Sequence, residues 1–318
     1  MTRVHVRVWL LRLVPVIAIV AATFLLLGET KPLDTTTVDL NNRLQVPPLR
    51  EESTWGRSQN GDLRVGMSGV VTPTLTLQNH RELVIFMGHE LERQATLVMR
   101  PTYAEVSGLI RRGQVDVSFV CSLLYVEGKA ASNMELLVAP QVNGRTVYYS
   151  YLIVPRDSPS SSYEDLRQGV FAFTDPISNS GHLVPAYYLS LFGETPDTFF
   201  SRYIYTHSHD NSIIAVANGL VDGAAVDSLV YEQLAVTNPE LVSRTKIIAR
   251  WGPYGIPPVV VNPALDPQLK EQLRNFFLNL HNSATGARIL HSLGIDRFVI
   301  VEDNLYDSIR QMRDKVGG

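Results

Sequence analysis

Cysteine is almost absent from this chain of 318 residues, and Cys121 carries its one thiol. A single cysteine excludes an internal disulfide, a cysteine-cluster zinc site and a lipid anchor on an N-terminal cysteine. Positive charge is also scarce, because 28 Lys and Arg residues stand against 31 Asp and Glu residues, for a net charge of -3. With no basic surplus to bind phosphate groups along a backbone, we expect no nucleic-acid partner.

The first residues of the chain have the pattern of an export signal. Arg3, Arg7 and Arg12 precede an uncharged run over residues 13–27, after which charged residues resume. The apolar segment over residues 8–27 approaches the roughly 20 residues that span a bilayer, and its positive flank favours the cytoplasmic side. We therefore predict that residues 1–29 are an uncleaved inner-membrane anchor and that the rest of the chain is periplasmic. Export with cleavage of a signal peptide is the alternative.

The remaining composition, 45% hydrophobic and 19% charged, is that of a globular protein with one large or two medium domains. Residues 30–61 lack hydrophobic periodicity and are predicted to be a linker. From residue 62 on, short β-branched runs alternate with amphipathic stretches, which predicts an α/β fold with mainly parallel sheet. The expected strands cover 63–67, 95–99 and 116–120, the expected helices cover 81–94 and 104–112, and further helices are expected at 269–280 and around residues 287 and 308.

Two segments of the chain repeat each other at an offset of 106 residues. RGQVDVSFVCSLLYVEG begins at Arg112, and NGLVDGAAVDSLVYEQL begins at Asn218. In both, a helix is expected to end at a glycine, a strand follows, and Ser122 or Ser228 is expected to cap the next helix. The repeat predicts two lobes of the same architecture. The alternative is that the order helix, glycine, strand, serine is simply common in α/β proteins. It also places Cys121 and Asp227 at equivalent strand ends, where open α/β sheets bind ligands.

Two loops supply further candidate ligand groups. The run Ser178-Asn179-Ser180-Gly181 lies between an expected strand and an expected helix, so that free backbone N–H groups and hydroxyls could hold an oxyanion, or could cap only the helix itself. His209 and Asp210 lie in the first turn of another expected helix, where the imidazole can donate to a ligand and the carboxylate can orient it or cap the helix.

Catalytic and metal-dependent functions are not expected. Two histidines and one aspartate on the tight turn around His209 lack a partner motif for a metal. No G-x-S-x-G sequence supports Ser178 or Ser180 as a hydrolase nucleophile. We therefore predict a protein that is not an enzyme and has no cofactor.

Taken in order, several motifs resemble one known family. They are YAE from Tyr103, GQVD before a strand, YYSYLIVPRDSP, TDPISNSGHLVP, HSHDNSIIAVANGLVDGAA and IPPVVVNP. From about Leu63 to the end, the chain resembles the PhnD-type phosphonate, phosphite and phosphate-binding subunits of ABC importers. The resemblance implies a type II periplasmic-binding-protein fold, with two α/β lobes joined by hinge strands. Lobe 1 would comprise 62–154 and 257–318, and lobe 2 would comprise 155–256.

The resemblance also implies a set of ligand-binding residues and shows where this chain departs from the family. Asn179 replaces the hydroxyl of the family's usual Ser-Thr-Ser, and Cys121 replaces the glycine of a usual Gly-Pro or Gly-Asn. The acidic residue that aminophosphonate binders place after the second hinge strand is missing, which argues against an aminophosphonate ligand. By position, the resemblance implies Tyr103, Tyr148, Ser178, Asn179, Ser180 and His209 as ligand-binding residues. The residue patterns described above add Cys121, Ser122, Gly181, Asp210 and Asp227 to the predicted set.

The functional hypothesis is a solute-binding protein that captures a small oxyanion or oxyacid and presents it to an ABC permease. Because these motifs contain no Arg or Lys, a protonated ligand fits better than a fully ionised phosphate. The alternative resembles the family's arsenite-sensing branch, in which Cys121 would bind As(III) and the protein would signal to a histidine kinase. Cys121 has an equally ordinary interpretation as a buried core residue.

Overall fold

The computed structural model of the protein describes residues 61–131 and 133–317. Contacts divide the chain into Met1–Thr54 and Trp55–Gly318, and every element below belongs to the second unit. The predicted anchor lies outside the described residues, as does the predicted linker except for Gly61. Within the described ranges, no helix combines the length and apolar character needed to cross a bilayer.

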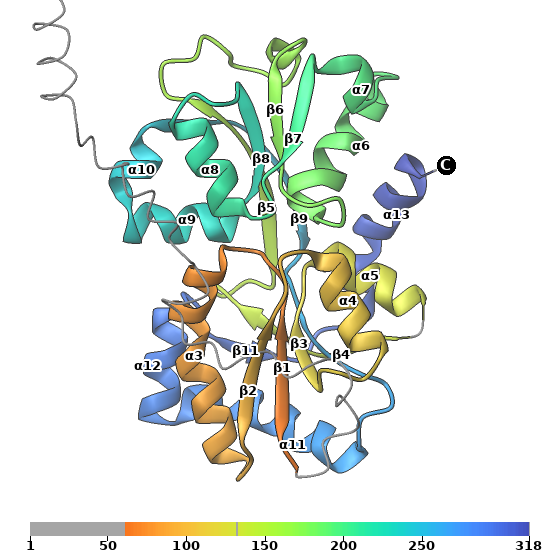
Figure 1. The fold of residues 1–318 in the computed structure, drawn as a ribbon, viewed down its shortest axis with the longest axis vertical. Helices are drawn as coiled ribbons and strands as arrows, with labels where there is room; N and C mark the ends of the chain where they lie inside the picture. Colours follow the sequence, from red (N-terminus) through yellow and green to blue (C-terminus); the bar gives the residue numbers. More distant parts are fainter. Residues whose placement is uncertain (1–60, 132, 318) are drawn as a thin grey trace, which may run out of the picture. The chain divides into compact units, whose positions relative to one another are not determined.

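The first sheet has six strands in the order β11-β4-β10-β3-β1-β2 (Figure 1). Its strands are β1 (Leu63–Met67), β2 (Ala95–Met99), β3 (Val117–Phe119), β4 (Glu135–Gln141), β10 (Val259–Val261) and β11 (Arg297–Val299). Its helices are α3 (Pro73–Glu90), α4 (Tyr103–Arg111), α5 (Ser122–Ala130), α11 (Pro267–Asn279) and α12 (Ala284–Ser292). We call this sheet and its helices lobe 1.

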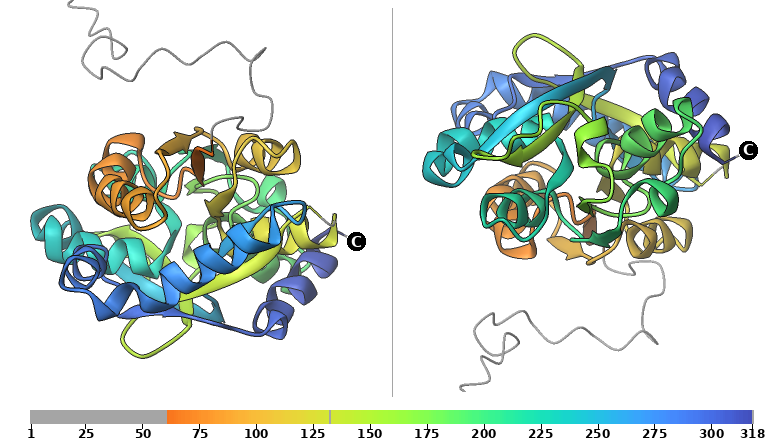
Figure 2. Two further views of the ribbon diagram at one scale, coloured as in Figure 1. Left: turned by 90° about the horizontal axis from the view of Figure 1, so that it is seen from below. Right: turned by 90° about the horizontal axis from the view of Figure 1, so that it is seen from above.

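The second sheet has five strands in the order β7-β6-β8-β5-β9. Its strands are β5 (Val147–Pro155), β6 (Val170–Phe173), β7 (Arg202–Tyr205), β8 (Gly223–Asp227) and β9 (Thr245–Gly255). Its helices are α6 (Val184–Leu191), α7 (Pro196–Phe199), α8 (His209–Ala217), α9 (Ser228–Thr237) and α10 (Pro239–Ser243). We call this group lobe 2. Figure 2 shows helices on both sides of the strands.

The α/β fold with two lobes is confirmed, but the prediction of mainly parallel sheet is wrong. β1 pairs in parallel with β2 and β3, and β6 pairs in parallel with β7 and β8. The strands that return from the other lobe or cross to it, β10 and β5 among them, pair antiparallel with their neighbours. Both sheets are therefore mixed, because each contains strands from distant parts of the chain.

The C-terminal helix α13 (Asp307–Val316) contacts elements of both lobes. It packs against α5 of lobe 1 and against α6 and β9 of lobe 2. Its buried residues Ile309 and Met312 belong to a hydrophobic cluster that also contains Tyr103 of lobe 1 and Phe173 of lobe 2. The apolar core is therefore continuous between the lobes at this side of the molecule.

The internal repeat appears in the structure as two equivalent sets of contacts. Gly113 and Gly219 have left-handed backbones, with φ of 64° and 65°, the conformation that favours glycine after a helix. Asp116 Oδ2 accepts the N–H of Arg64 at 2.7 Å, and Asp222 Oδ2 accepts the N–H of Val170 at 2.7 Å. Asp116, just before β3, thereby binds β1, and Asp222, just before β8, binds β6.

The expected serine caps of the repeat are wrong by one residue. Cys121 and Asp227 are the N-cap residues of α5 and α9, and the serines begin the helices. Ser122 Oγ donates to the carbonyl of Gly255 at 2.7 Å, and Ser228 Oγ accepts the N–H of Tyr149 at 3.0 Å. Both serines therefore bind the ends of the long strands β9 and β5 instead of closing their own helices.

Candidate functional site

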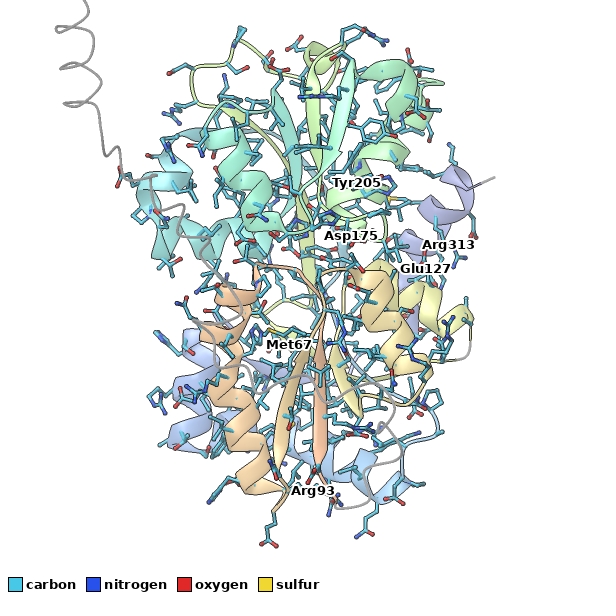
Figure 3. All side chains as sticks on the ribbon, in the orientation of Figure 1. Met67, Arg93, Glu127, Asp175, Tyr205 and Arg313 are labelled. Atoms are coloured by element: carbon cyan, nitrogen blue, oxygen red, sulfur yellow. The ribbon has the colours of Figure 1, made fainter. Side chains whose placement is uncertain are left out.

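The predicted site residues lie where the two lobes meet. Tyr103 opens α4 after β2, Cys121 follows β3, and Asp227 ends β8, so strand ends from both sheets contribute. Figure 3 shows Asp175, which follows β6, in the region between the lobes. Carboxyl ends of parallel strands are the common ligand-binding edge of open α/β sheets. All eleven predicted residues are buried, and Tyr103, Ser122, Ser178 and Asn179 are fully so.

The thiol of Cys121 joins the two lobes. Its Sγ accepts the N–H of Asn179 at 3.3 Å and donates to the carbonyl of Ile177 at 3.5 Å. Burial raises the pKa of this thiol to about 12, because the apolar surroundings penalise the thiolate. Cys121 is therefore a protonated thiol at neutral pH, with hydrogen-bond partners on the opposite lobe.

Asn179, Tyr148 and Ser122 form a polar chain that ends on β9. The Asn179 amide Nδ2 donates to the Tyr148 phenol at 2.9 Å. The phenol also interacts with the Ser122 hydroxyl, which in turn donates to Gly255. Burial raises the pKa of Tyr148 well above its usual value. Among the described residues, Asn179 Oδ1 is buried without a hydrogen-bond partner.

Tyr103 supplies a second buried polar atom of this kind. Its backbone N–H donates to Asp175 Oδ2 at 3.3 Å, across the lobe boundary, while its phenolic oxygen has no partner in the described part of the chain. Burial raises its pKa well above the usual value, with contributions from Cys121 and Asp227. A buried phenol without a partner costs free energy unless a ligand or water supplies one.

His209 is held as a neutral imidazole of defined tautomer. The backbone N–H of Asp227 donates to His209 Nδ1 at 3.1 Å, and the Thr174 hydroxyl lies 3.1 Å from the same nitrogen. Because Nδ1 accepts, the ring hydrogen is on Nε2. Burial lowers the pKa of His209 to about 3, so Nε2–H is a neutral donor at physiological pH.

Asp227 is the buried carboxyl group of the cluster. Its Oδ1 accepts the N–H of Leu229 at 2.7 Å, which caps α9. Burial raises its pKa to about 7 against this capping interaction. Tyr103, Cys121 and Tyr148 all interact electrostatically with it, as the facing arrangement of the repeat predicted for Cys121. The interaction partners of the cluster named here include neither Arg nor Lys.

The loop at Ser178 differs from the predicted helix N-terminus. Residues Asn179–Leu183 form a π-helical turn before α6. Gly181 N–H donates to Ser178 Oγ at 3.0 Å, and Asn179 N–H binds Cys121, so these two amides are not free as expected. A Cβ on Gly181 would lie 2.3 Å from Thr174 Oγ1, which requires glycine. The Ser180 carbonyl accepts the Ser150 hydroxyl at 2.7 Å, which fixes the turn against β5.

One interpretation of the sequence was that Asp210 orients His209, and this interpretation is wrong. Its Oδ1 accepts the N–H of Thr72, at 3.0 Å, from the loop before α3 in lobe 1. The neighbouring His209 N–H donates to the carbonyl of Val70, at 2.9 Å, in the same loop. The start of α8 therefore joins the lobes.

Thr174 and Asp175 belong to the cluster but were not predicted as site residues. Thr174 holds His209, and Asp175 accepts the N–H groups of Tyr103 and Ile177. The signal was present as Thr-Asp-Pro after an apolar strand, a sequence that favours a turn with its polar side chains bonded locally.

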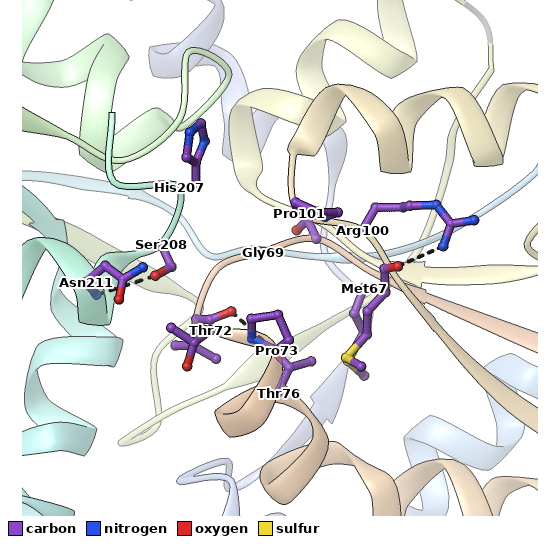
Figure 4. A pocket seen from close by; sticks show the side chains of 13 residues that line it. Met67, Gly69, Thr72, Pro73, Thr76, Arg100, Pro101, His207, Ser208 and Asn211 are labelled. Carbon is purple, nitrogen blue, oxygen red and sulfur yellow. Dashed lines mark hydrogen bonds between the residues drawn. The ribbon is translucent and has the colours of Figure 1, made fainter. Parts of the chain in front are cut away.

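A cavity of about 100 Å³ lies beside the cluster, between the loops that precede α3, α4 and α8 (Figure 4). Met67, Met99 and Pro101 give it apolar walls, and residues of both lobes line it. Ser68 Oγ, on its wall, is buried without a partner within the described ranges. The two lobes therefore meet incompletely at this point.

Two α/β lobes of mixed sheet, with buried polar side chains from both lobes at their junction, have the architecture of the type II periplasmic-binding-protein fold. The family model for ABC transporter, phosphonate, periplasmic substrate-binding proteins matches residues 65–306, and the chain belongs to this family. The family resemblance and the type II fold are thereby confirmed. Members of the family are binding components and not enzymes, as predicted.

Curated relatives agree with this assignment. The chain is 29% identical over 219 residues to the phosphonates-binding periplasmic protein of Escherichia coli, covering 67% of this chain and 64% of that protein. It is 26% identical over 152 residues to a probable ABC transporter phosphite binding protein of Prochlorococcus marinus, covering 46% and 51%. The chain thus spans about half to two thirds of the length of these relatives.

Solved structures show the same fold. A binding protein component of an ABC phosphonate transporter from Pseudomonas aeruginosa superposes with a TM-score of 0.77 at 25% identity, over 81% of this chain and 87% of that one. PhnD1 of Prochlorococcus marinus in complex with methylphosphonate gives a TM-score of 0.74 at 20% identity, over 81% and 98%. None of the relatives named here is described as an arsenite sensor.

Proposed function

We propose that this protein is an extracytoplasmic solute-binding protein that captures a small phosphonate-type oxyanion between its lobes and presents it to an ABC permease. The eleven predicted residues, with Thr174 and Asp175, would form or support the ligand site. The hinge would separate 62–154 and 257–318 from 155–256, so that β5, which we assigned to lobe 2 by its strand pairing, would be a hinge strand. An N-terminal anchor would hold the protein at the inner membrane.

The observation that carries this proposal concerns two buried oxygens at the lobe junction that have no hydrogen-bond partner among the residues the structure describes. Tyr103 Oη comes from lobe 1 and Asn179 Oδ1 from lobe 2, and His209 Nε2–H adds a neutral donor. A tetrahedral oxyanion with acceptor oxygens and a hydroxyl would satisfy such groups from both sides at once. Relatives named for phosphonate and phosphite support the same ligand class.

The arsenite alternative loses its physical basis. As(III) binds thiolate sulfur, whereas burial raises the pKa of Cys121 to about 12. Both hydrogen-bonding directions of the thiol are occupied by backbone groups of residues 177 and 179. Cys121 is better explained as a link between the lobes.

Thermal unfolding of the full-length chain with methylphosphonate, phosphite, phosphate and arsenite tests the proposal. A ligand at about 100 times its dissociation constant adds about 2.7 kcal/mol to the free energy of unfolding, which raises the midpoint by several degrees. We expect at least one phosphorus oxyanion to do so and arsenite to have no effect. Tyr103→Phe removes one partnerless hydroxyl and should weaken the shift without lowering the ligand-free midpoint. Stabilisation by arsenite alone would contradict the proposal.

A further inference from the structure

The hydrogen bonds around Asn179 orient its side-chain amide. The carbonyl of Gly255 can only accept, so the Ser122 hydroxyl directs its hydrogen there, at 2.7 Å. The phenolic oxygen of Tyr148 accepts the Asn179 amide Nδ2–H at 2.9 Å.

This orientation determines what Asn179 offers to a ligand. With its Nδ2 engaged by Tyr148, the side chain presents only Oδ1, which is buried and has no partner among the described residues. A carbonyl oxygen accepts hydrogen bonds and cannot donate them. A ligand atom placed against Asn179 Oδ1 must therefore carry a hydrogen.

The charge of the surroundings points the same way. Asp227 lies in the cluster as a buried carboxyl group, and its recorded partners are the backbone amides of Leu229 and Val230. Three side chains from other elements face its carboxyl group: Tyr103 of α4, Cys121 before α5 and Tyr148 of β5. Glu232 faces it from its own helix, and its backbone N–H binds His209 of α8. This set contains no cation, because His209 is neutral. A second negative charge on the ligand would meet Asp227 without compensation.

Resting on the function proposed above, we propose that the site selects a singly protonated oxyanion, an alkylphosphonate or phosphite monoanion. The ligand's P–O–H donates to Asn179 Oδ1, and its remaining oxygens accept from Tyr103 O–H and His209 Nε2–H. Asn179 recognises the hydrogen, and Asp227 excludes the dianion. Both residues determine specificity through the protonation state of the ligand.

Methanesulfonate is the matched comparison ligand, because it has the shape and single charge of the methylphosphonate monoanion but no O–H. Calorimetry on the full-length chain at about pH 6, where alkylphosphonates are largely monoanions, should show methanesulfonate binding about 10- to 100-fold more weakly than methylphosphonate. This is the loss expected when a buried acceptor is left unpaired. Affinities that agree within about threefold would overturn the role of Asn179.

The pH dependence is the second readout. Once methylphosphonate has lost its second proton, its affinity should fall about tenfold per pH unit, because the competent form becomes rarer by that factor. Burial holds the pKa values of Tyr103, Tyr148 and Cys121 above this range and that of His209 near 3, so these groups do not titrate in it. Asp227, whose pKa burial raises to about 7, ionises within the range, so Asp227→Asn is measured beside the wild-type chain to separate the ionisation of this carboxyl group from that of the ligand. A constant affinity for methylphosphonate from about pH 6 to 9 would contradict selection of the monoanion.

Two conservative variants separate the two roles. Asn179→Thr introduces the hydroxyl usual in the family, which can donate, and should bring methanesulfonate within about threefold of methylphosphonate. Asp227→Asn keeps an oxygen that can cap α9 but removes the charge, and should reduce the loss of affinity at high pH. If methylphosphonate, phosphite and phosphate all fail to bind the wild-type chain at any pH, the proposed function is wrong. If they bind but methanesulfonate binds equally, only the proton requirement is wrong.

Discussion

Cys121 illustrates how a single residue acquires its role from its surroundings. In the sequence, one thiol beside a serine suggested either a soft ligand for As(III) or a core residue. In the structure the thiol is neither a free ligand nor mere filler, because it binds backbone groups of residues 177 and 179 from the opposite lobe. Burial raises its pKa to about 12, which keeps the hydrogen that it donates.

We predict that Cys121→Ser preserves ligand binding and that Cys121→Ala weakens it. A hydroxyl can donate and accept in the same two directions as the thiol, so the affinity for methylphosphonate should stay within about threefold. Alanine leaves the Asn179 N–H and the Ile177 carbonyl without partners when the lobes meet, at a cost of about 1–3 kcal/mol, or roughly 5- to 150-fold in affinity. Calorimetry on both variants measures this difference. Equal losses in the serine and alanine variants would show that sulfur chemistry is required.

At the scale of elements, the repeat gives each lobe a helix whose first residue binds a long strand. Ser122 on α5 donates to Gly255 of β9, and Ser228 on α9 accepts from Tyr149 of β5. The two bonds are equivalent in position but opposite in direction. Ser122 alone also belongs to the polar chain that ends at Asn179. Ser228 is therefore a control position for Ser122 in tests of the polar chain.

We predict that Ser122→Ala and Ser228→Ala lower stability by similar amounts but differ in their effect on binding. Each removes a hydrogen bond of a buried serine, which costs about 1–3 kcal/mol and is measured by urea unfolding. Ser122→Ala also removes the hydroxyl that interacts with the Tyr148 phenol, so that the phenol can turn its hydrogen toward Asn179 and reverse the amide. Discrimination against methanesulfonate should fall in this variant and persist in Ser228→Ala. If both variants discriminate equally between methylphosphonate and methanesulfonate, the orientation proposed for the Asn179 amide is wrong.

Local patterns in the sequence predicted the elements whose signals are local. β1 and β2 have the predicted bounds, and α4 begins one residue early, at a capping box between Thr102 and Glu105. α3 begins at Pro73 and not at the predicted Arg81. The sequence did not predict its first turns, because their alternating Thr-Leu-Thr-Leu has the period of a strand. The predicted C-terminal helices correspond to α11, α12 and α13. The π-helical turn after Ser178 had no local signal, since it depends on the contact of Gly181 with Thr174.

At the scale of the whole molecule, the sequence predicted which residues gather but not how they bind one another. Strand ends and the repeat were enough to place Cys121 and Asp227 in one cluster. The partners of Asp210 and Cys121 lie on the other lobe, and no periodicity encodes a contact between such distant segments. The mixed sheets were missed for the same reason, since β10 returns to the first sheet after the entire second one.

These contacts across the lobe junction affect ligand binding indirectly, because they stabilise the closed form of the protein. Thr72 N–H binds Asp210 Oδ1 at 3.0 Å, and His209 N–H binds the Val70 carbonyl at 2.9 Å. Such bonds exist only while the lobes meet, so they add to the free energy of closure and not to the stability of either lobe. A ligand that requires the closed form binds more weakly by the factor by which that form is depleted.

We therefore predict that Asp210→Ala weakens methylphosphonate binding although the Asp210 side chain binds Thr72 and not the ligand. The Thr72 N–H loses its acceptor in the closed form alone, at a cost of about 1–3 kcal/mol, which corresponds to roughly 5- to 150-fold in affinity. Asn211→Ala is the matched control, because its amide donates to Thr206 within lobe 2 and makes no bond to lobe 1 among the described residues. Small-angle scattering with calorimetry should show a larger, ligand-free form in Asp210→Ala that compacts only at higher ligand concentration. Equal affinity and equal size in the two variants would mean that the start of α8 does not hold the lobes together.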